Sequence, residues 1–216
     1  VWSPDNKSVI LIEKKKLQVS KAYLINTDRF TPPEQLNDVS YQLSLILRQW
    51  QNEEKEELKN KLKKLPEQLV KIATESASLI SFSPDEKRFF YLATESAKIA
   101  ENLIPHPPAR STQPEERGIK PNNIYVYDLK EDTNFRLGTT EEKAPIYWLD
   151  NRHLLFINQE KSEIKVIEAD ATNEQTIYSG PFEDNFIFPS PSGKSLIILT
   201  SLHPDSPGDL YEVRVR

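Results

Sequence analysis

The sequence predicts an all-β fold, a β-propeller with about four recognisable blade repeats, and three observations support this prediction. A short turn signature recurs four times, an aromatic residue stands near each copy, and an apolar run follows each copy. Repetition of this kind is typical of propellers, whose four-stranded blades take ~40–45 residues each. The signatures lie at residues 3–7, 83–87, 149–152 and 190–194.

Each signature has the composition of the tight turn in a β-hairpin. Proline fixes φ at the second position of such a turn, and Asp, Asn and Gly tolerate the backbone that follows. In the clearest copy, Ser83-Pro84-Asp85, we expect the turn to join antiparallel strands at residues 80–82 and 89–92. We expect Asp5 and Asp85 to make turn hydrogen bonds through their side chains, not to serve as a general acid or base.

A further strand is predicted after each hairpin, because β-branched and aromatic residues dominate the segment that follows it. These segments are residues 22–26, 124–128, 164–168 and 210–214.

The spacing between signatures predicts two insertions in a single propeller region, residues 1–216. The interval from Asp150 to Ser192 fits one four-stranded blade, whereas the two earlier intervals are longer. We assign the excess to a helical insertion at residues 31–77 and a proline-rich loop insertion at residues 102–122.

The first insertion predicts two amphipathic helices, at residues 36–50 and 53–65, because leucines and other apolar residues recur there with helical spacing. Pro66 should end or restart the second helix. One interpretation is a helical hairpin that binds a partner. The alternative is that both apolar faces pack on the propeller or on each other, which leaves the charged residues as a solvated face.

The second insertion contains Pro105, Pro107, Pro108, Pro114 and Pro121, a composition that favours extended or disordered chain. It could be a recognition loop over one face of the ring, or a mobile spacer. In the first case its polar contact groups would be Arg110, Glu115, Glu116 and Arg117.

Aromatic side chains in the later repeats allow two interpretations. They could line a groove for glycans or peptides, since each ring offers an apolar face. They could instead pack in the core between blades. The residues concerned are Tyr125, Tyr127, Tyr147, Trp148 and Tyr211.

No catalytic constellation is visible, so we predict a non-enzyme without catalytic, cofactor-binding or metal-binding residues. The three histidines, His106, His153 and His203, lack metal-ligand spacing. The sequence has no cysteine, no GxSxG motif and no glycine-rich phosphate loop among its five dispersed glycines.

The overall charge and hydropathy narrow the class of partner. The net charge of −5 argues against nucleic acid, which binds basic surfaces. No apolar run approaches the ~20 residues of a membrane span, so we expect no direct membrane insertion.

The chain begins inside the first hairpin and ends on a strand of the fourth unit. We therefore expect an arc of a larger ring, whose open edges would favour self-association.

The hairpin signature at residues 83–87, followed by Ile-Tyr-Val-Tyr-Asp-Leu at residues 124–129, resembles the WD40-like (PD40) repeat of TolB-type bacterial β-propellers. Residues 113–117 and 120–132 are similar to propeller regions that follow PEGA domains in bacterial surface proteins. The third copy lacks Ser-Pro, and the fourth has Ser192-Gly193 in place of Asp-x.

We therefore expect a non-catalytic scaffold that binds a protein or peptide, with a glycan as the further candidate from the aromatic residues. The resemblance implies a location at the cell envelope or surface. An alternative is the substrate-gating propeller of a serine peptidase or other hydrolase whose catalytic domain lies elsewhere. A third interpretation is an inert structural spacer.

Overall fold

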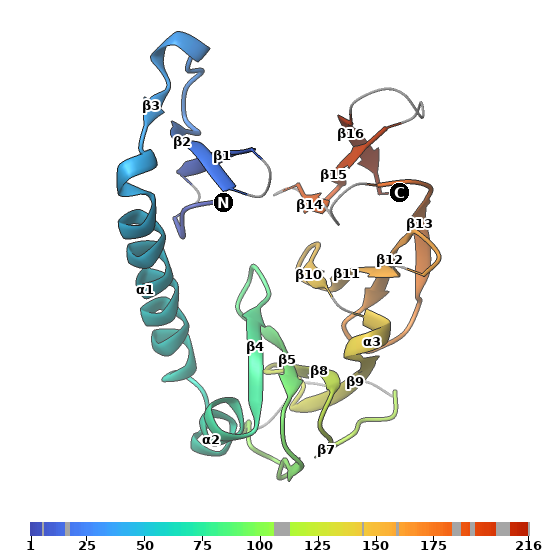
Figure 1. Ribbon diagram of the computed structural model, residues 1–216. Coiled ribbons are helices and arrows are strands. Elements are labelled where there is room, and N and C mark those ends of the chain that lie inside the picture. The colour runs from blue at the N-terminus through green and yellow to red at the C-terminus, as the bar shows by residue number, and fades with distance from the viewer. Residues whose placement is uncertain are drawn as a thin grey trace. The chain divides into compact units, whose positions relative to one another are not determined.

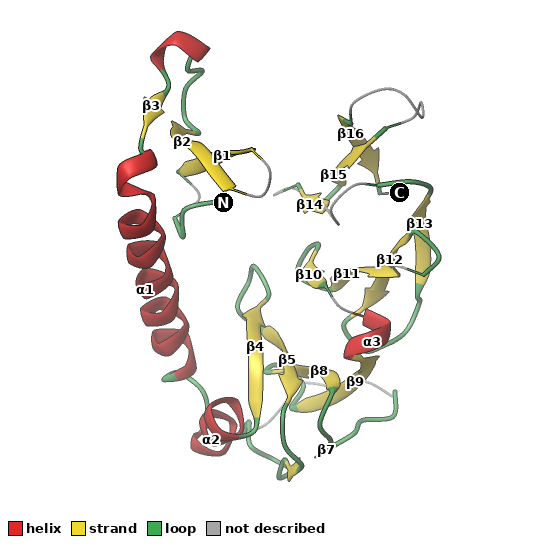
Figure 2. Cartoon of the chain, in the orientation of Figure 1, coloured by secondary structure: helices red, strands yellow, loops and turns green. Residues whose placement is uncertain are grey.

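The computed structural model describes residues 1–5, 7–15, 18–105, 113–143, 145–158, 160–182, 187–190, 193–201 and 208–215. The described chain is mainly β-strand, arranged in several antiparallel sheets, with helices concentrated in its first half (Figure 1, Figure 2). It forms two compact units, Val1–Leu65 and Pro66–Arg216.

The first unit contains a three-stranded sheet, here called the first sheet. Its strands are β1 (Ser8–Lys15), β2 (Gln18–Asn26) and β3 (Asn37–Asp38), in that order. Trp2 forms an isolated bridge with Val9, so the predicted hairpin at residues 3–7 is present. β3 lies inside the predicted insertion at 31–77, yet it pairs with β2. The insertion therefore contributes a short strand as well as helices.

The helices differ from the two that the sequence predicted. Residues 36–50 and 53–65 do not form separate helices, because α1 (Leu43–Leu62) runs through the expected break at residues 51 and 52. Short 3-10 turns, Pro33–Gln35 and Ser40–Gln42, precede it. Pro66 does restart the chain as a new helix, α2 (Glu67–Glu75). The helix is continuous because residues 43–62 are mostly good helix formers, even though their apolar side chains do not all lie on one face of α1.

The apolar start of α1 packs on the first sheet. Ile10 and Ala22 are buried beneath it, together with Val39. The α1 side chains in this cluster are Leu43, Ile46, Leu47 and Trp50. This contact supports the interpretation that the helix buries its apolar face within its own unit.

Within the described residues, the second unit contains a two-stranded sheet and three larger sheets, and the larger ones are here called the second, third and fourth sheets. The second has the order β4-β5-β8-β9, the third β10-β11-β12-β13 and the fourth β14-β15-β16. Their bounds are β4 Ala77–Phe82, β5 Arg88–Ala93, β8 Asn123–Asp128, β9 Thr133–Thr139, β10 Ile146–Trp148, β11 His153–Asn158, β12 Glu163–Glu168, β13 Gln175–Ser179, β14 Ile187–Pro189, β15 Ser195–Thr200 and β16 Asp209–Arg214. The four-residue helix α3 (Thr140–Lys143) links the second sheet to the third.

The predicted hairpin and its turn chemistry are confirmed at residues 80–92. β4 pairs antiparallel with β5 through Phe82 and Phe89. Ser83 Oγ donates to Asp85 Oδ1 at 2.8 Å, and the same carboxylate oxygen accepts from Lys87 N at 3.2 Å. Asp5 makes the equivalent bonds to Ser3 Oγ and Lys7 N. The four further strands that the sequence predicted lie within β2, β8, β12 and β16.

The second, third and fourth sheets pack face to face in chain order. We call the face of a sheet that turns toward the following sheet its forward face, and the opposite one its backward face. Phe90 and Val126 on the forward face of the second sheet share a core with Leu154 and Phe156 on the backward face of the third. In the same way, Leu155, Ile157 and Val166 on the forward face of the third sheet share a core with Leu196 and Ile198 on the backward face of the fourth.

The backward face of the second sheet is covered by the chain itself. This face carries Phe89, Tyr91, Tyr125 and Tyr127, all nearly fully buried. The short strands β6 (Ala97–Lys98) and β7 (Gly118–Ile119) pair with each other in the segment between β5 and β8. Tyr125 Oη accepts from Lys120 N at 3.0 Å, which attaches this segment to the sheet. α2 joins the same cover, because Gln68 Oε1 accepts from Ala100 N.

The loop insertion at 102–122 is therefore anchored where the structure describes it, at residues 102–105 and 113–122. Arg117, expected as a contact group for a partner, is instead buried. Its Nη1 donates to Ala100 O at 2.5 Å, its Nε to Glu115 Oε2 at 2.9 Å, and its Nη2 pairs with Asp132. Arg110, Pro107 and Pro108 lie outside the described residues.

Candidate functional site

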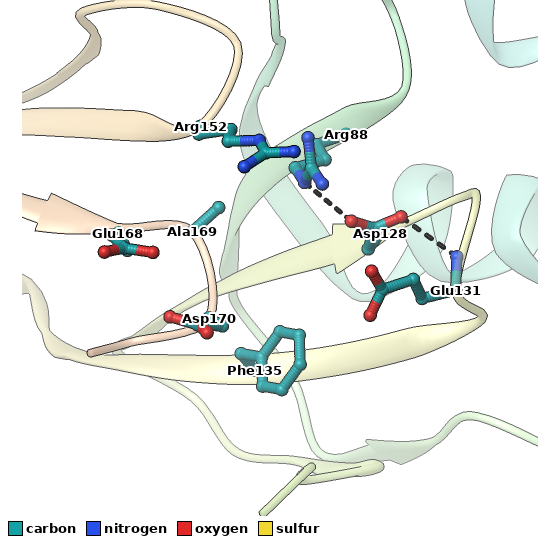
Figure 3. A pocket seen from close by; sticks show the side chains of 8 residues that line it. All are labelled: Arg88, Asp128, Glu131, Phe135, Arg152, Glu168, Ala169 and Asp170. Carbon is teal, nitrogen blue, oxygen red and sulfur yellow. Dashed lines mark hydrogen bonds and ion pairs between the residues drawn. The ribbon is translucent and has the colours of Figure 1, made fainter. Parts of the chain in front are cut away.

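A pocket of about 240 Å³ opens between the second and third sheets, and we call it the seam pocket. Strand ends and turns of the two sheets converge on it, so side chains far apart in sequence share one small space (Figure 3). It is lined by Arg88, Asp128, Glu131, Phe135, Arg152, Glu168, Ala169 and Asp170.

An ion pair forms one wall of the seam pocket. Arg88 Nε lies 2.6 Å from Asp128 Oδ2, and both side chains are largely buried. Arg88 Nη1 also donates to Asn151 O at 3.0 Å, which joins the second sheet to a turn of the third. Asp128 Oδ1 accepts from Lys130 N and Glu131 N, so this carboxylate also closes the β8–β9 turn.

The opposite wall comes from the turn after β12. Glu168 Oε1 accepts from Asn173 Nδ2 at 2.6 Å, and Asp170 Oδ1 accepts from Thr172 N and Oγ1. Arg152 is exposed beside Arg88 (Figure 3), and no ion pair of its guanidinium is found within the described part of the chain. With four carboxylates and two guanidinium groups, the pocket lining is acidic by two charges.

The carboxylates of the seam pocket suit the binding of a cationic group. Hydrogen bonds already hold Asp128, Glu168 and Asp170 in their turns, so these groups are fixed before any ligand arrives. A cationic side chain would meet preorganised acceptors there, together with the apolar surface of Phe135.

A larger pocket of about 800 Å³ lies beside α3. Lys143 is buried in its wall, with Nζ 3.9 Å from the centre of the Phe156 ring and an ion pair to Glu174. Lys165 Nζ reaches the same carboxylate at 3.0 Å. Burial raises the pKa of Glu174, but hydrogen bonds from Lys143 and Lys165 outweigh it and hold this pKa below its usual range. Two of the cations that line this pocket thus share one carboxylate.

His153 is the histidine that the structure describes. It begins β11, and its Nδ1 lies 2.8 Å from Asp150 Oδ2. His106 and His203 lie outside the described residues. Among the residues that are described, no three His, Asp or Glu side chains are grouped so that they could hold a metal ion.

The aromatic residues separate into buried and surface groups. Tyr125 and Tyr127 are fully buried, so they cannot line an open groove, and packing is their role here. Trp148 packs against the core between the second and third sheets, and its Nε1 donates to Ser81 O at 3.0 Å. Tyr147 and Tyr211 remain partly exposed.

The sequence did not indicate the seam pocket. Its residues belong to four separate segments that are unremarkable one by one. The pairing of β5 with β8 and of β11 with β12, and the packing of the second sheet on the third, bring them together.

No described helix is both long enough and apolar enough to span a bilayer.

Comparisons with known proteins give only distant likeness. No family model matches the sequence, and no curated protein matches it. Among solved structures, a "putative TolB" from Agrobacterium tumefaciens aligns with a TM-score of 0.38 and 16% identity over 98% of this chain and 62% of its own. The chain thus spans less than two thirds of that protein. A "putative conserved lipoprotein" from Clostridium novyi aligns with a TM-score of 0.37 and 15% identity, over 65% of this chain and 88% of its own. At such scores the likeness identifies neither a family nor a function.

Proposed function

We propose that this chain is part of a β-propeller that acts as a non-catalytic scaffold, binding a protein or peptide partner at the bacterial cell envelope. The observation that carries this proposal is the succession of three antiparallel sheets in residues 66–216, each packing its forward face on the backward face of the next. Successive blades of a propeller pack in the same way. The second and third sheets also have the four strands of a complete blade.

Binding is the activity that such a scaffold supports best. Both faces of the central strands of the third sheet, β11 and β12, are committed to packing, and only its outer strands β10 and β13 carry exposed side chains. Turns and strand ends are then the parts that can meet a partner. The seam pocket is the place where turns of two sheets converge on charged side chains that are already fixed.

The acidic excess of the seam pocket favours a partner with an exposed lysine or arginine. Such a side chain would place its cation among Glu131, Glu168 and Asp170 and its aliphatic stem against Phe135. Attraction of this kind weakens with added salt, because the pocket is open to solvent.

A peptide array tests this proposal. Labelled full chain should be retained by peptides rich in Lys and Arg, and the retention should fall with rising salt and in a variant that carries Glu131→Gln and Glu168→Gln. The matched control carries Glu54→Gln and Glu95→Gln, which remove two exposed carboxylates that do not line the pocket. Equal loss in both variants would show that net charge, not the pocket, is responsible.

The non-catalytic part of the proposal needs a separate measurement. The purified chain should not turn over a panel of chromogenic peptides, glycosides and phosphoesters. Turnover that one substitution in this chain abolishes would overturn the non-catalytic assignment.

Fractionation of the source cells, followed with an antibody, checks the envelope location, and recovery with the cytosol would contradict that location.

A further inference from the structure

A second pocket of about 240 Å³ lies between the third and fourth sheets, and we call it the second seam pocket. Both sheets belong to the second unit and share a packed core, so the walls of this pocket are parts of one compact structure. They come from the turn before β11, the facing ends of β12 and β13, the turn before β15 and the residue that follows β16. The seam pocket has walls of the same kinds, one sheet earlier in the chain.

A matching backbone contact marks the same wall of both pockets. At the seam pocket, Ala169 follows β12, and its N donates to Arg152 O at 2.8 Å. At the second seam pocket, Val215 follows β16, and its N donates to Lys194 O at 2.9 Å. In the third sheet, a turn and β13 come after this residue without filling the seam pocket. The two pockets therefore occupy equivalent places in successive seams.

Glu168 lines both pockets. Alternation along β12 puts it on the forward face with Val166, and its place at the end of the strand also brings it to the third-sheet side of the seam pocket (Figure 3). Its Oε1 accepts from Asn173 Nδ2 at 2.6 Å, which fixes the carboxylate. The two pockets thus adjoin across the end of the third sheet, with one fixed carboxylate between them.

The second seam pocket is acidic, as the first one is. Its described lining contains two carboxylates, those of Asp150 and Glu168, and no lysine or arginine. Asp150 Oδ1 accepts from Arg152 N at 2.7 Å and from His153 N at 2.8 Å, and His153 Nδ1 lies 2.8 Å from Asp150 Oδ2. Burial raises the pKa of Asp150, but these hydrogen bonds outweigh it and hold this pKa below its usual range. The carboxylate is therefore charged at neutral pH.

Aliphatic side chains form the rest of the wall. Leu149 and Val166 are buried there, and Ile177 and Val215 are half-buried. A lysine or arginine of a partner would lay its aliphatic stem on this surface and place its cation beside the carboxylates. The second seam pocket thus offers the same two kinds of contact as the seam pocket, where Phe135 would receive the stem.

We propose that the two pockets act together, and that the partner is a peptide segment with two basic residues, one for each pocket. This inference rests on the proposed function, in which the seam pocket receives the first of these residues. The two cations would lie on either side of Glu168, and a segment with two positive charges would complement the negative charge of both pockets. Because one peptide would link the two contacts, the second would gain from a high effective concentration, and binding would strengthen more than additively.

Peptides with one or two lysines, titrated against the full chain by fluorescence anisotropy, test this proposal. In a series whose two lysines move apart one residue at a time, at least one spacing should bind roughly tenfold or more tighter than the single-lysine peptide. Gln175→Lys should remove this gain, because Gln175 is exposed, lies opposite Val166 and lines the second seam pocket, where a lysine would add a competing positive charge. The variant should keep most of its affinity for the single-lysine peptide, since the seam pocket is intact.

Thr176→Lys is the matched control, since Thr176 is also exposed on β13 but lines neither pocket. A series in which no spacing binds tighter than the single-lysine peptide would overturn the pairing of the pockets and leave the proposed function intact. A gain that Gln175→Lys and Thr176→Lys reduce equally would also overturn the pairing, because overall charge would then explain the gain. Failure of every peptide to bind would overturn the proposed function, and the pairing with it.

Discussion

Replacing Arg117 with methionine should loosen the cover of the second sheet while leaving the first unit unchanged. Arg117 is 8% exposed, and its guanidinium donates to Ala100 O, Glu115 and Asp132. Asp132 is completely buried. Methionine fills a similar volume but removes the guanidinium that pairs with the buried Asp132 carboxylate.

The size of the effect follows from these contacts. Removing one partner of a buried ion pair costs about 3–5 kcal/mol, because the other charge remains buried and uncompensated. Asp132 still accepts from Tyr127 Oη and Asn102 N, so we expect the lower end, about 3 kcal/mol. Arg117→Lys should cost less, because lysine keeps the charge but not the planar fork.

Native-state hydrogen exchange followed by mass spectrometry measures the loss locally. Peptides from residues 113–139 should exchange roughly 100-fold faster in Arg117→Met, the factor that corresponds to about 3 kcal/mol. Adding Asp132→Asn should recover part of the protection, because it removes the charge of the buried carboxylate as well. Arg48→Met removes an exposed arginine of α1 and serves as control. Unchanged exchange in these peptides would refute the idea that Arg117 holds the cover in place.

Three further predictions concern stability. Gly193 has a φ of +67°, and a Cβ there would lie 2.9 Å from Asp150 Cβ. Gly193→Ala should therefore lower the free energy of unfolding, measured in urea, by about 1–3 kcal/mol. Gly118→Ala should be nearly neutral, because nothing lies within 4 Å of the added Cβ. Leu155 is 0% exposed between the third and fourth sheets, so Leu155→Ala should cost about 2–5 kcal/mol; a smaller cost than that of the exposed Leu45→Ala would contradict the packing. Burial raises the pKa of Tyr91 and of Tyr127. Their contribution to stability should be complete below the unfolded value of about 10 and should fall as the pH rises above it; Tyr91→Phe should flatten this alkaline loss, measured as the urea midpoint against pH.

The sequence was sufficient for features that depend on neighbouring residues. The turn at Ser83-Pro84-Asp85 follows from fixed proline φ and from the short reach of the Asp85 carboxylate to Lys87 N. The strand at residues 124–128 follows from its β-branched and aromatic composition. Pro66 separates two helices because it removes a backbone donor.

Tertiary structure decided which residues meet. The sequence placed Arg117 in a loop with other polar residues, and nothing local distinguished it from an exposed contact group. It is buried because Asp132 lies beside it once β7 and β9 are both in place. The seam pocket likewise needs tertiary structure: the pairing of β5 with β8 places Arg88 beside Asp128, and the packing of the third sheet on the second adds the Asn151 turn.

The sequence also could not predict whether a strand face is buried or exposed. Leu11 stands eight residues after Ser3, as Tyr91 stands eight residues after Ser83, and both belong to apolar runs of similar pattern. Tyr91 is buried because the chain returns over it, with Asn134 accepting from its hydroxyl at 2.9 Å, whereas within the described residues of its own unit no such return covers Leu11. Alternation along a strand shows which side chains share a face, but burial depends on what packs there, and segments distant in sequence supply that cover.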